Sequence, residues 1–147
     1  MSELASAARP ARPEIRNLNL FRDIPTYRMP LAGYVSILHR VSGVLLFAAL
    51  PFLVWLFDAS ISSEISYRRF VSAFSAGLWI FPGWAVKLGV LALLWSYLHH
   101  LCAGVRYLVM DATHVTSKEF GKSSGIAVLA VSLLLTAICG AKLFGAW

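Results

Sequence analysis

The sequence predicts an all-α integral membrane protein with three transmembrane helices. Hydrophobic residues make up 59% of the 147 residues and charged residues only 14%, whereas soluble domains average about a quarter charged. Several apolar runs are long enough for a bilayer, whose hydrocarbon core of about 30 Å needs about 20 helical residues. The charges lie between these runs and in the N-terminal segment, so the net charge of +6 does not indicate a nucleic-acid-binding surface.

The chain is predicted to have two parts, an irregular surface segment over residues 1–30 and a transmembrane domain over residues 31–147. Pro30 suits a helix start because proline fits the first turn. Pro51 is a candidate kink inside the first span. The three spans are expected at about residues 32–57, 78–110 and 124–141. Three spans alone make a thin bundle, so we expect partner helices.

The distribution of Lys and Arg predicts the orientation. The N-terminal segment and the loop after the second span hold more of these residues than the opposite side of the membrane. The positive-inside rule therefore predicts a cytoplasmic N-terminus. A bacterial inner membrane is favoured over the mitochondrial inner membrane, because Glu3, Glu14 and Asp23 are atypical of a mitochondrial transit segment.

This topology brings the polar residues of two spans into one leaflet. The first span starts on the cytoplasmic side and carries Ser36, His39 and Arg40. The second span ends on that side and carries His99, His100, Arg106 and Asp111. We therefore expect the two polar groups to converge at one depth, although about sixty residues separate them.

The second span has the spacing of a haem site. Residues at i, i+4, i+7 and i+11 share one helical face, and here these are His100, Gly104, Tyr107 and Asp111. An imidazole ligates haem iron, and a glycine one turn away leaves room for the macrocycle. His99 points about 100° away, so one helix cannot direct both histidines at one iron. A second axial ligand must come from elsewhere.

The first span has residues that suit an anionic partner. An arginine in the bilayer costs about 2.5–3.5 kcal/mol at mid-span, and a haem propionate or a bound anionic intermediate would offset that cost for Arg40. The Ser36 hydroxyl suits a quinone carbonyl oxygen. Structural alternatives stay open: Arg40 and His39 also suit the membrane interface, Ser36 also suits a bond to the carbonyl one turn earlier, and His100 also suits packing against a neighbouring helix.

Three segments together identify a resemblance: "RPEIRNLNL", "YRMPLAGYVSILHRVSG" and "HLCAGVRYLVMD". In order and spacing, they resemble the cytochrome b556 membrane-anchor subunits of succinate dehydrogenase, over nearly the whole chain. The combination of S-x-x-H-R-x-S/T-G with H-x-x-x-G-x-R is specific, whereas either motif alone would be weak.

The resemblance implies a place in a larger complex. A flavoprotein subunit and an iron–sulfur subunit oxidise succinate at the membrane surface, and electrons pass to ubiquinone bound near the anchor. Haem b lies between this chain and a second small anchor subunit, each giving one axial histidine. The chain would then be a part of a succinate:quinone oxidoreductase that does not itself oxidise succinate.

The resemblance also implies roles for individual residues. His100 matches the axial ligand of the haem iron and Gly104 its accompanying glycine. The residues matching the haem surroundings and the quinone site are His39, Arg40 and Arg106 for the haem, and Ser36 and Arg40 for the quinone. Asp111 matches the family's terminal aspartate, although on chemistry alone a helix cap or an ion pair with Arg106 is favoured for it. Tyr107 departs from the family, since many relatives have histidine there.

Other functions remain in competition. A haem-free anchor and the anchor of a fumarate reductase are the near alternatives. A di-iron membrane oxygenase needs many histidines, and this chain has four. A transporter would predict interrupted helices or charges paired across the bilayer, which the sequence does not indicate.

Overall fold

The computed structural model describes residues 19–23 and 26–145, in which the secondary structure is helical apart from one isolated β-bridge and the helices are joined by turns and loops. Its helices are α1 (Leu20–Asp23), α2 (Leu31–Ile61), α3 (Glu64–Ala73), α4 (Gly83–Thr113) and α5 (Lys118–Leu143). The helices α2, α4 and α5 are long and apolar enough to cross a membrane, which confirms the all-α, three-span fold class. Most of the predicted surface segment 1–30 lies outside the described residues.

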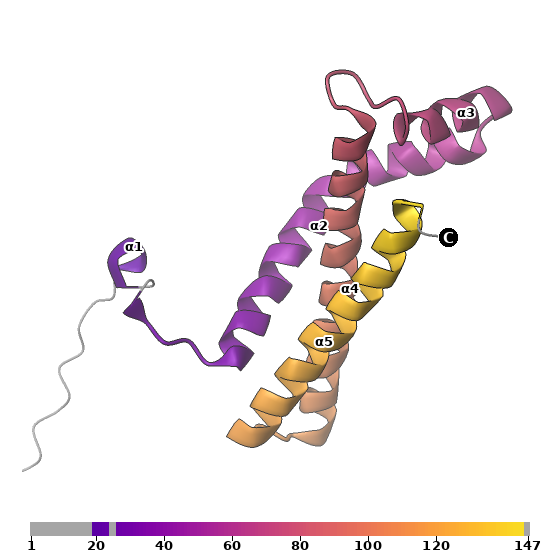
Figure 1. Cartoon of the computed structure of the whole chain (residues 1–147). Helices are drawn as coiled ribbons and strands as arrows, with labels where there is room; N and C mark the ends of the chain where they lie inside the picture. The colour runs from indigo at the N-terminus through magenta and orange to yellow at the C-terminus, as the bar shows by residue number, and fades with distance from the viewer. Residues whose placement is uncertain (1–18, 24–25, 146–147) are drawn as a thin grey trace, which may run out of the picture.

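The helix α4 is the centre of the arrangement. It packs against both α2 and α5, and α2 also contacts α5 and the short α3 (Figure 1). The chain therefore presents α4 with two distinct interfaces, one toward α2 and one toward α5.

The interior between the helices is small. Val35 of α2, Ala103 of α4 and Val128 of α5 form its buried apolar cluster. Gly125 assists the close approach of α5, because a Cβ there would lie 3.7 Å from a Val35 methyl carbon. Small residues commonly allow such approach between membrane helices. Many large apolar side chains of the described helices are exposed on the outside of the bundle.

The start of α4 differs from the sequence expectation. The apolar pattern predicts a span from about residue 78, but α4 begins at Gly83, after Pro82. Leu78 and Phe81 exchange backbone hydrogen bonds of 2.8 and 2.9 Å, which close a tight turn. Gly77 enters this turn with a φ of 101°, a conformation that glycine adopts without steric strain. The apolar residues before Pro82 therefore form a turn that precedes the helix.

The start of α5 is also displaced, in the other direction. The helix begins at Lys118, because the Ser117 hydroxyl accepts a 3.2 Å hydrogen bond from the Phe120 amide and caps the helix. Glu119 in the first turn complements the helix dipole. The predicted polar loop 111–123 shortens to residues 114–117, since hydropathy alone does not reveal that polar residues continue a helix.

The helix α2 continues through Pro51 to Ile61. The polar connection that follows contains α3, which starts with a reciprocal cap between Ser63 and Ser66. In Figure 1 the last part of α2 and the short α3 lie side by side, at the end of the bundle where α4 begins. This end of the bundle is opposite to the end where α2 begins.

Candidate functional site

The polar residues of the first two spans meet between α2 and α4. The rings of His39 and His100 stack with centroids 4.1 Å apart and planes inclined by 14°. The ring of Tyr107 lies 5.2 Å from that of His39. The predicted convergence of the two polar groups is confirmed by this contact.

Hydrogen bonds from α2 hold one nitrogen of His100. Its Nδ1 lies 3.0 Å from the backbone carbonyl oxygen of His39 and 3.2 Å from the Ser42 hydroxyl oxygen. A carbonyl oxygen can only accept, so we assign the proton to Nδ1. The other ring nitrogen, Nε2, then carries a free lone pair. This is the tautomer in which histidines typically ligate metals, with the distal N–H held by a carbonyl group.

Gly43 forms a close-fitting wall beside the same ring. A Cβ built on Gly43 would lie 3.0 Å from His100 Cε1, closer than ordinary van der Waals contact, and 3.4 Å from Nδ1, at its lower limit. A side chain at position 43 would therefore require the imidazole to shift by a few tenths of an ångström from the position in which it bonds to α2.

The free nitrogen of His100 reaches the surface of the chain. Within residues 19–23 and 26–145, His99 Nε2 is the one fully buried side-chain nitrogen or oxygen atom that lacks a hydrogen-bond partner. His100 Nε2 has no partner among these residues either, and its ring is only half-buried. It is thus available to a group outside this chain.

His99 lies in the buried interior, where its ring meets α5 and is also within reach of the Val35 backbone of α2. It is fully buried, its Nδ1 lies 3.4 Å from the Ser132 hydroxyl of α5, and its ring stacks on Trp95 with a centroid distance of 5.4 Å. The side-chain hydrogen bonds of the two adjacent histidines therefore go to different helices, His99 to α5 and His100 to α2. This agrees with the angle of about 100° between neighbouring residues on a helix.

Arg106 lies on the same face of α4 as His99. It is 7% exposed, its Nε donates to the Ser124 hydroxyl at 2.8 Å, and its Nη2 donates to the Gly121 carbonyl oxygen at 3.4 Å. These contacts join α4 to α5. The role toward a haem propionate that the resemblance implies for Arg106 stays a prediction.

The prediction that Asp111 forms a helix cap or an ion pair with Arg106 is wrong for the residues that the structure describes, because the Asp111 side chain forms neither contact among them. The described residues contain a single salt bridge, from Arg68 to Glu64 on α3, and Asp111 is exposed. The reason is geometric, since residues five positions apart on a helix point about 140° away from one another at about 100° per residue. Arg106 faces α5, and Asp111 does not.

Ser36 and Arg40 lie along the edge of the α2–α4 contact. They are next in sequence to Val35 and His39, and they share a helical stripe with Gly43. Arg40 is exposed, and neither side chain forms a hydrogen bond with the residues that the structure describes. The alternative in which Ser36 bonds back to its own helix is therefore not found. Both polar groups are free for a ligand or partner.

The space beside Gly104 is shared with His39. A Cβ on Gly104 would lie 3.7 Å from His39 Nε2, an ordinary contact distance. The missing side chain therefore leaves a shallow surface next to the stacked imidazoles, and a modest substitution there meets no clash inside this chain.

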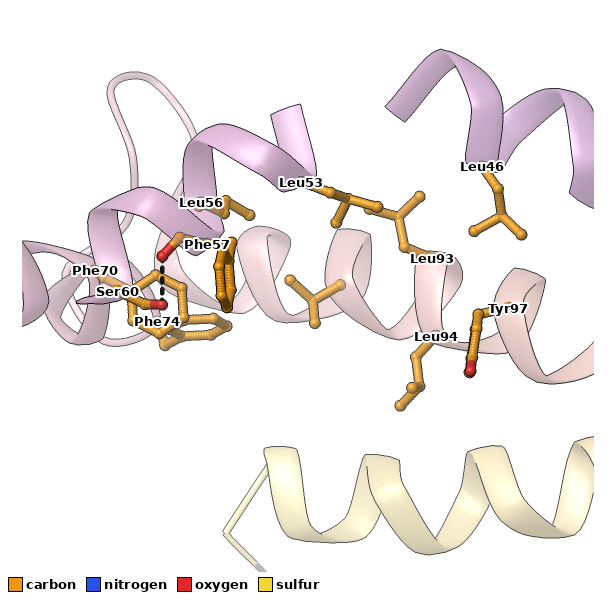
Figure 2. A pocket seen from close by; sticks show the side chains of 11 residues that line it. Leu46, Leu53, Leu56, Phe57, Ser60, Phe70, Phe74, Leu93, Leu94 and Tyr97 are labelled. Carbon is orange, nitrogen blue, oxygen red and sulfur yellow. Dashed lines mark hydrogen bonds between the residues drawn. The ribbon is translucent and has the colours of Figure 1, made fainter. Parts of the chain in front are cut away.

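A separate apolar groove lies near the other end of α2. Figure 2 shows its lining of leucine and aromatic side chains from α2, α3 and α4, including Phe57, Phe70 and Leu93. Its volume is about 430 Å³. The Ser60 hydroxyl within it is satisfied by the Phe57 carbonyl oxygen at 2.7 Å. This groove offers apolar contact and little hydrogen bonding, so it does not resemble the polar cluster around His100.

The roles of Ser42 and Gly43 were not anticipated from the sequence. A signal existed, because Val35, His39 and Ser42 follow i, i+4, i+7 and share one face. The buried position of Arg106 had a similar signal, since it lies seven residues after His99. Spacing indicates a common face, but it does not indicate which neighbouring helix that face meets.

The donor set fits one axial position of a haem. His100 offers a neutral imidazole with an accessible Nε2, and the adjacent glycines keep bulk away from it. His39 cannot supply the opposite axial position, because stacked rings lie side by side whereas axial ligands approach the iron from opposite faces. If this chain holds a haem through His100, any second ligand to the iron would have to come from a group other than His39.

Fold and site together define a multi-pass helical membrane protein that presents one imidazole nitrogen beside its α2–α4 contact. Residues 9–139 match the family described as succinate dehydrogenase/fumarate reductase transmembrane subunit, and the chain belongs to this family.

Curated relatives carry one common name, succinate dehydrogenase cytochrome b556 subunit. The chain is 29% identical to the protein of Paracoccus denitrificans, over 83% of this chain and 88% of the relative. It is 32% identical to that of Coxiella burnetii, over 85% of this chain and 94% of the relative. It is 30% identical to that of Rickettsia prowazekii, over 75% and 80%.

Proposed function

We propose that this chain is the haem b-binding membrane-anchor subunit of a succinate dehydrogenase. The observation that carries the proposal is His100, whose Nδ1–H is held by α2 while Nε2 is free at the surface. The relatives are named as cytochrome subunits of that enzyme. The partners would be a flavoprotein subunit, an iron–sulfur subunit and a second small anchor subunit that supplies the opposite axial ligand.

His100 would hold the haem iron through Nε2, with Gly43 and Gly104 keeping the surroundings of the ring free of bulk. When bound, the haem supplies a one-electron carrier at membrane depth. The residues of this chain hold and orient the ligand: the His39 carbonyl and the Ser42 hydroxyl bind the distal N–H, and the stacked His39 ring covers one face of the imidazole.

Ser36 and Arg40 would form this chain's part of a ubiquinone site. Measured from Leu31 at about 1.5 Å per residue, they lie about 8 and 14 Å along α2. This depth suits a lipid-soluble substrate that receives electrons from a donor at the surface. Arg40 would stabilise negative charge developing on the quinone oxygens, and Ser36 would donate a hydrogen bond that orients the headgroup.

The direction and membrane follow from the same proposal. The curated relatives are named for succinate dehydrogenase, so we assign succinate oxidation coupled to quinone reduction. The excess of Lys and Arg on the side where α2 begins favours a cytoplasmic N-terminus in a bacterial inner membrane. Outer apolar faces of the three spans would then meet lipid and the second anchor subunit.

The haem assignment is tested by a visible difference spectrum of the purified native complex, reduced minus oxidised. We expect a b-type band that His100→Ala abolishes while all subunits still co-purify. His114→Asn is the matched control, because His114 is exposed, lies at a φ of 54° that asparagine tolerates, and is outside the site. A full b-type band in His100→Ala would refute the assignment.

The quinone assignment is tested by two activities of one preparation. Ser36→Ala is expected to lower succinate:quinone reductase activity by about fivefold, since one hydrogen bond contributes about 1 kcal/mol and 1.36 kcal/mol is tenfold. Succinate oxidation by a soluble dye should stay unchanged. Ser60→Ala removes a hydroxyl from the same helix that already bonds to its own backbone, so it should alter neither activity. Unchanged quinone reduction in Ser36→Ala would remove Ser36 from the site.

A further inference from the structure

We propose that Ser42 is a positioning residue for the imidazole that ligates haem. Its hydroxyl would fix the proton of His100 on Nδ1, set the rotation of the ring and tune the donor strength of Nε2. The proposal rests on the proposed function, because it needs His100 to be the ligand.

The burial of Ser42 supports this role. Ser42 is fully buried between α2 and α4, so its hydroxyl must find its partners within the protein. Its oxygen lies 2.9 Å from the His39 carbonyl oxygen and 3.2 Å from His100 Nδ1. The hydroxyl therefore links a backbone group of α2 to the side chain of α4.

The direction of each bond follows from the chemistry of the groups. The carbonyl oxygen of His39 only accepts, so the Ser42 hydroxyl donates its hydrogen there. The lone pairs of the hydroxyl oxygen then face His100, whose Nδ1–H is shared between the carbonyl oxygen and the hydroxyl oxygen. Two acceptors on Nδ1–H exclude the tautomer with a proton on Nε2.

The second acceptor also changes the iron. Hydrogen-bond acceptors on the distal N–H raise the basicity of a ligating histidine. A more basic ligand stabilises ferric over ferrous iron and lowers the midpoint potential. Removing the Ser42 hydroxyl is therefore expected to raise the midpoint potential of the haem.

Neighbouring contacts define what Ser42 adds. The His39 ring covers one face of His100, and Gly43 lies against the Cε1 edge. These contacts restrict where the ring lies, but they do not choose which nitrogen carries the proton. The hydroxyl and the carbonyl make that choice.

The test uses two variants of equal shape in the intact complex, Ser42→Thr and Ser42→Val. They differ by one hydroxyl, so any difference between them reports the hydrogen bond and not the added bulk. We expect Ser42→Val to raise the haem midpoint potential, shift the g-values of the low-spin ferric signal, and speed haem loss to excess apomyoglobin about tenfold. Ser42→Thr should stay close to the wild type in all three.

A third variant covers the case in which Ser42→Val does not assemble. Ser42→Ala removes the hydroxyl without adding volume, and its matched control is Ser96→Ala. Ser96 is also buried, but its hydroxyl bonds back to the Ala92 carbonyl of its own helix at 2.9 Å. The potential and g-values should change in Ser42→Ala and stay unchanged in Ser96→Ala.

The outcomes separate the inference from the proposed function. If His100→Ala abolishes the b-type band but the hydroxyl-free variants keep the wild-type potential and g-values, the positioning role is overturned while ligation stands. If His100→Ala retains the band, both fail. A fall in potential on removal of the hydroxyl also overturns the role, because it contradicts the predicted increase in basicity.

Discussion

Gly43→Ala provides a direct test of the close contact between α2 and the His100 ring. The new Cβ would lie 3.0 Å from Cε1, where ordinary contact begins at 3.4 Å, so the ring must give by a few tenths of an ångström. The ring has little freedom to do so, because His39 stacks on it and two acceptors hold Nδ1.

The magnitude follows from two opposed terms. Overpacking of this kind costs about 1–3 kcal/mol, whereas replacing glycine by alanine within a helix contributes about 1 kcal/mol of stability. Gly89→Ala isolates the second term, because a Cβ at Gly89 in α4 meets nothing within 4 Å. The difference between the two variants therefore measures the strain at the imidazole.

The assay is the temperature at which each purified complex loses its b-type band. We expect Gly89→Ala to match or exceed the wild type, and Gly43→Ala to lose its band at a lower temperature, with a shifted ferric signal. The close-contact argument is refuted if Gly43→Ala holds haem as firmly as Gly89→Ala with unchanged spectra.

Three further variants test neighbouring contacts. Gly104→Ala should leave subunit assembly intact, because its Cβ would lie an acceptable 3.7 Å from His39 Nε2. The assembled complex should contain less haem, because the added methyl group would occupy space that the haem needs. A full haem content would contradict this role of Gly104. Arg106→Ala should lower the free energy of unfolding of the complex by about 1.5–3 kcal/mol, since it removes charged hydrogen bonds from α4 to α5. Exposed Arg69→Ala should have little effect. Equal stabilities of the two variants would contradict a stabilising role of the Arg106 hydrogen bonds. His99→Ala should lower the free energy of unfolding by about 2–5 kcal/mol, because it leaves a cavity at a fully buried position. The haem midpoint potential should stay unchanged. Loss of the b-type band in a complex that still assembles would contradict the expectation that His99 is not a haem ligand.

The sequence was sufficient for the number of spans and for the meeting of two polar groups. The number of spans follows from the length of the apolar runs, and the common leaflet of the two polar groups follows from the distribution of Lys and Arg. The common depth of the two polar groups was anticipated in this way, whereas the stacking of His39 on His100 was not.

Helix ends and interface partners were less predictable. The turn before Pro82 is as apolar as the helix after it, and the polar first turn of α5 resembles a loop in hydropathy. The partner of Arg106 depends on where α5 lies, which no pattern within α4 records. The role of Ser42 was unpredictable for the same reason, because its hydroxyl contacts His100 Nδ1, which lies 58 residues later in the sequence.

The adjacent positions of His99 and His100 have a consequence for divergence among homologous chains. The side-chain hydrogen bond of His99 goes to α5 and that of His100 goes to α2, so the two neighbouring positions are subject to different structural constraints. Changes on the α5 side can be compensated by α5 within this chain, whereas under the proposed function the α2 side would also have to keep the haem ligand in place. A single-residue insertion upstream in α4 would rotate the pair by about 100° and replace one constraint by the other. Substitution should therefore be tolerated more readily at position 99 than at position 100, and gaps should be excluded from the segment that joins them to Gly104.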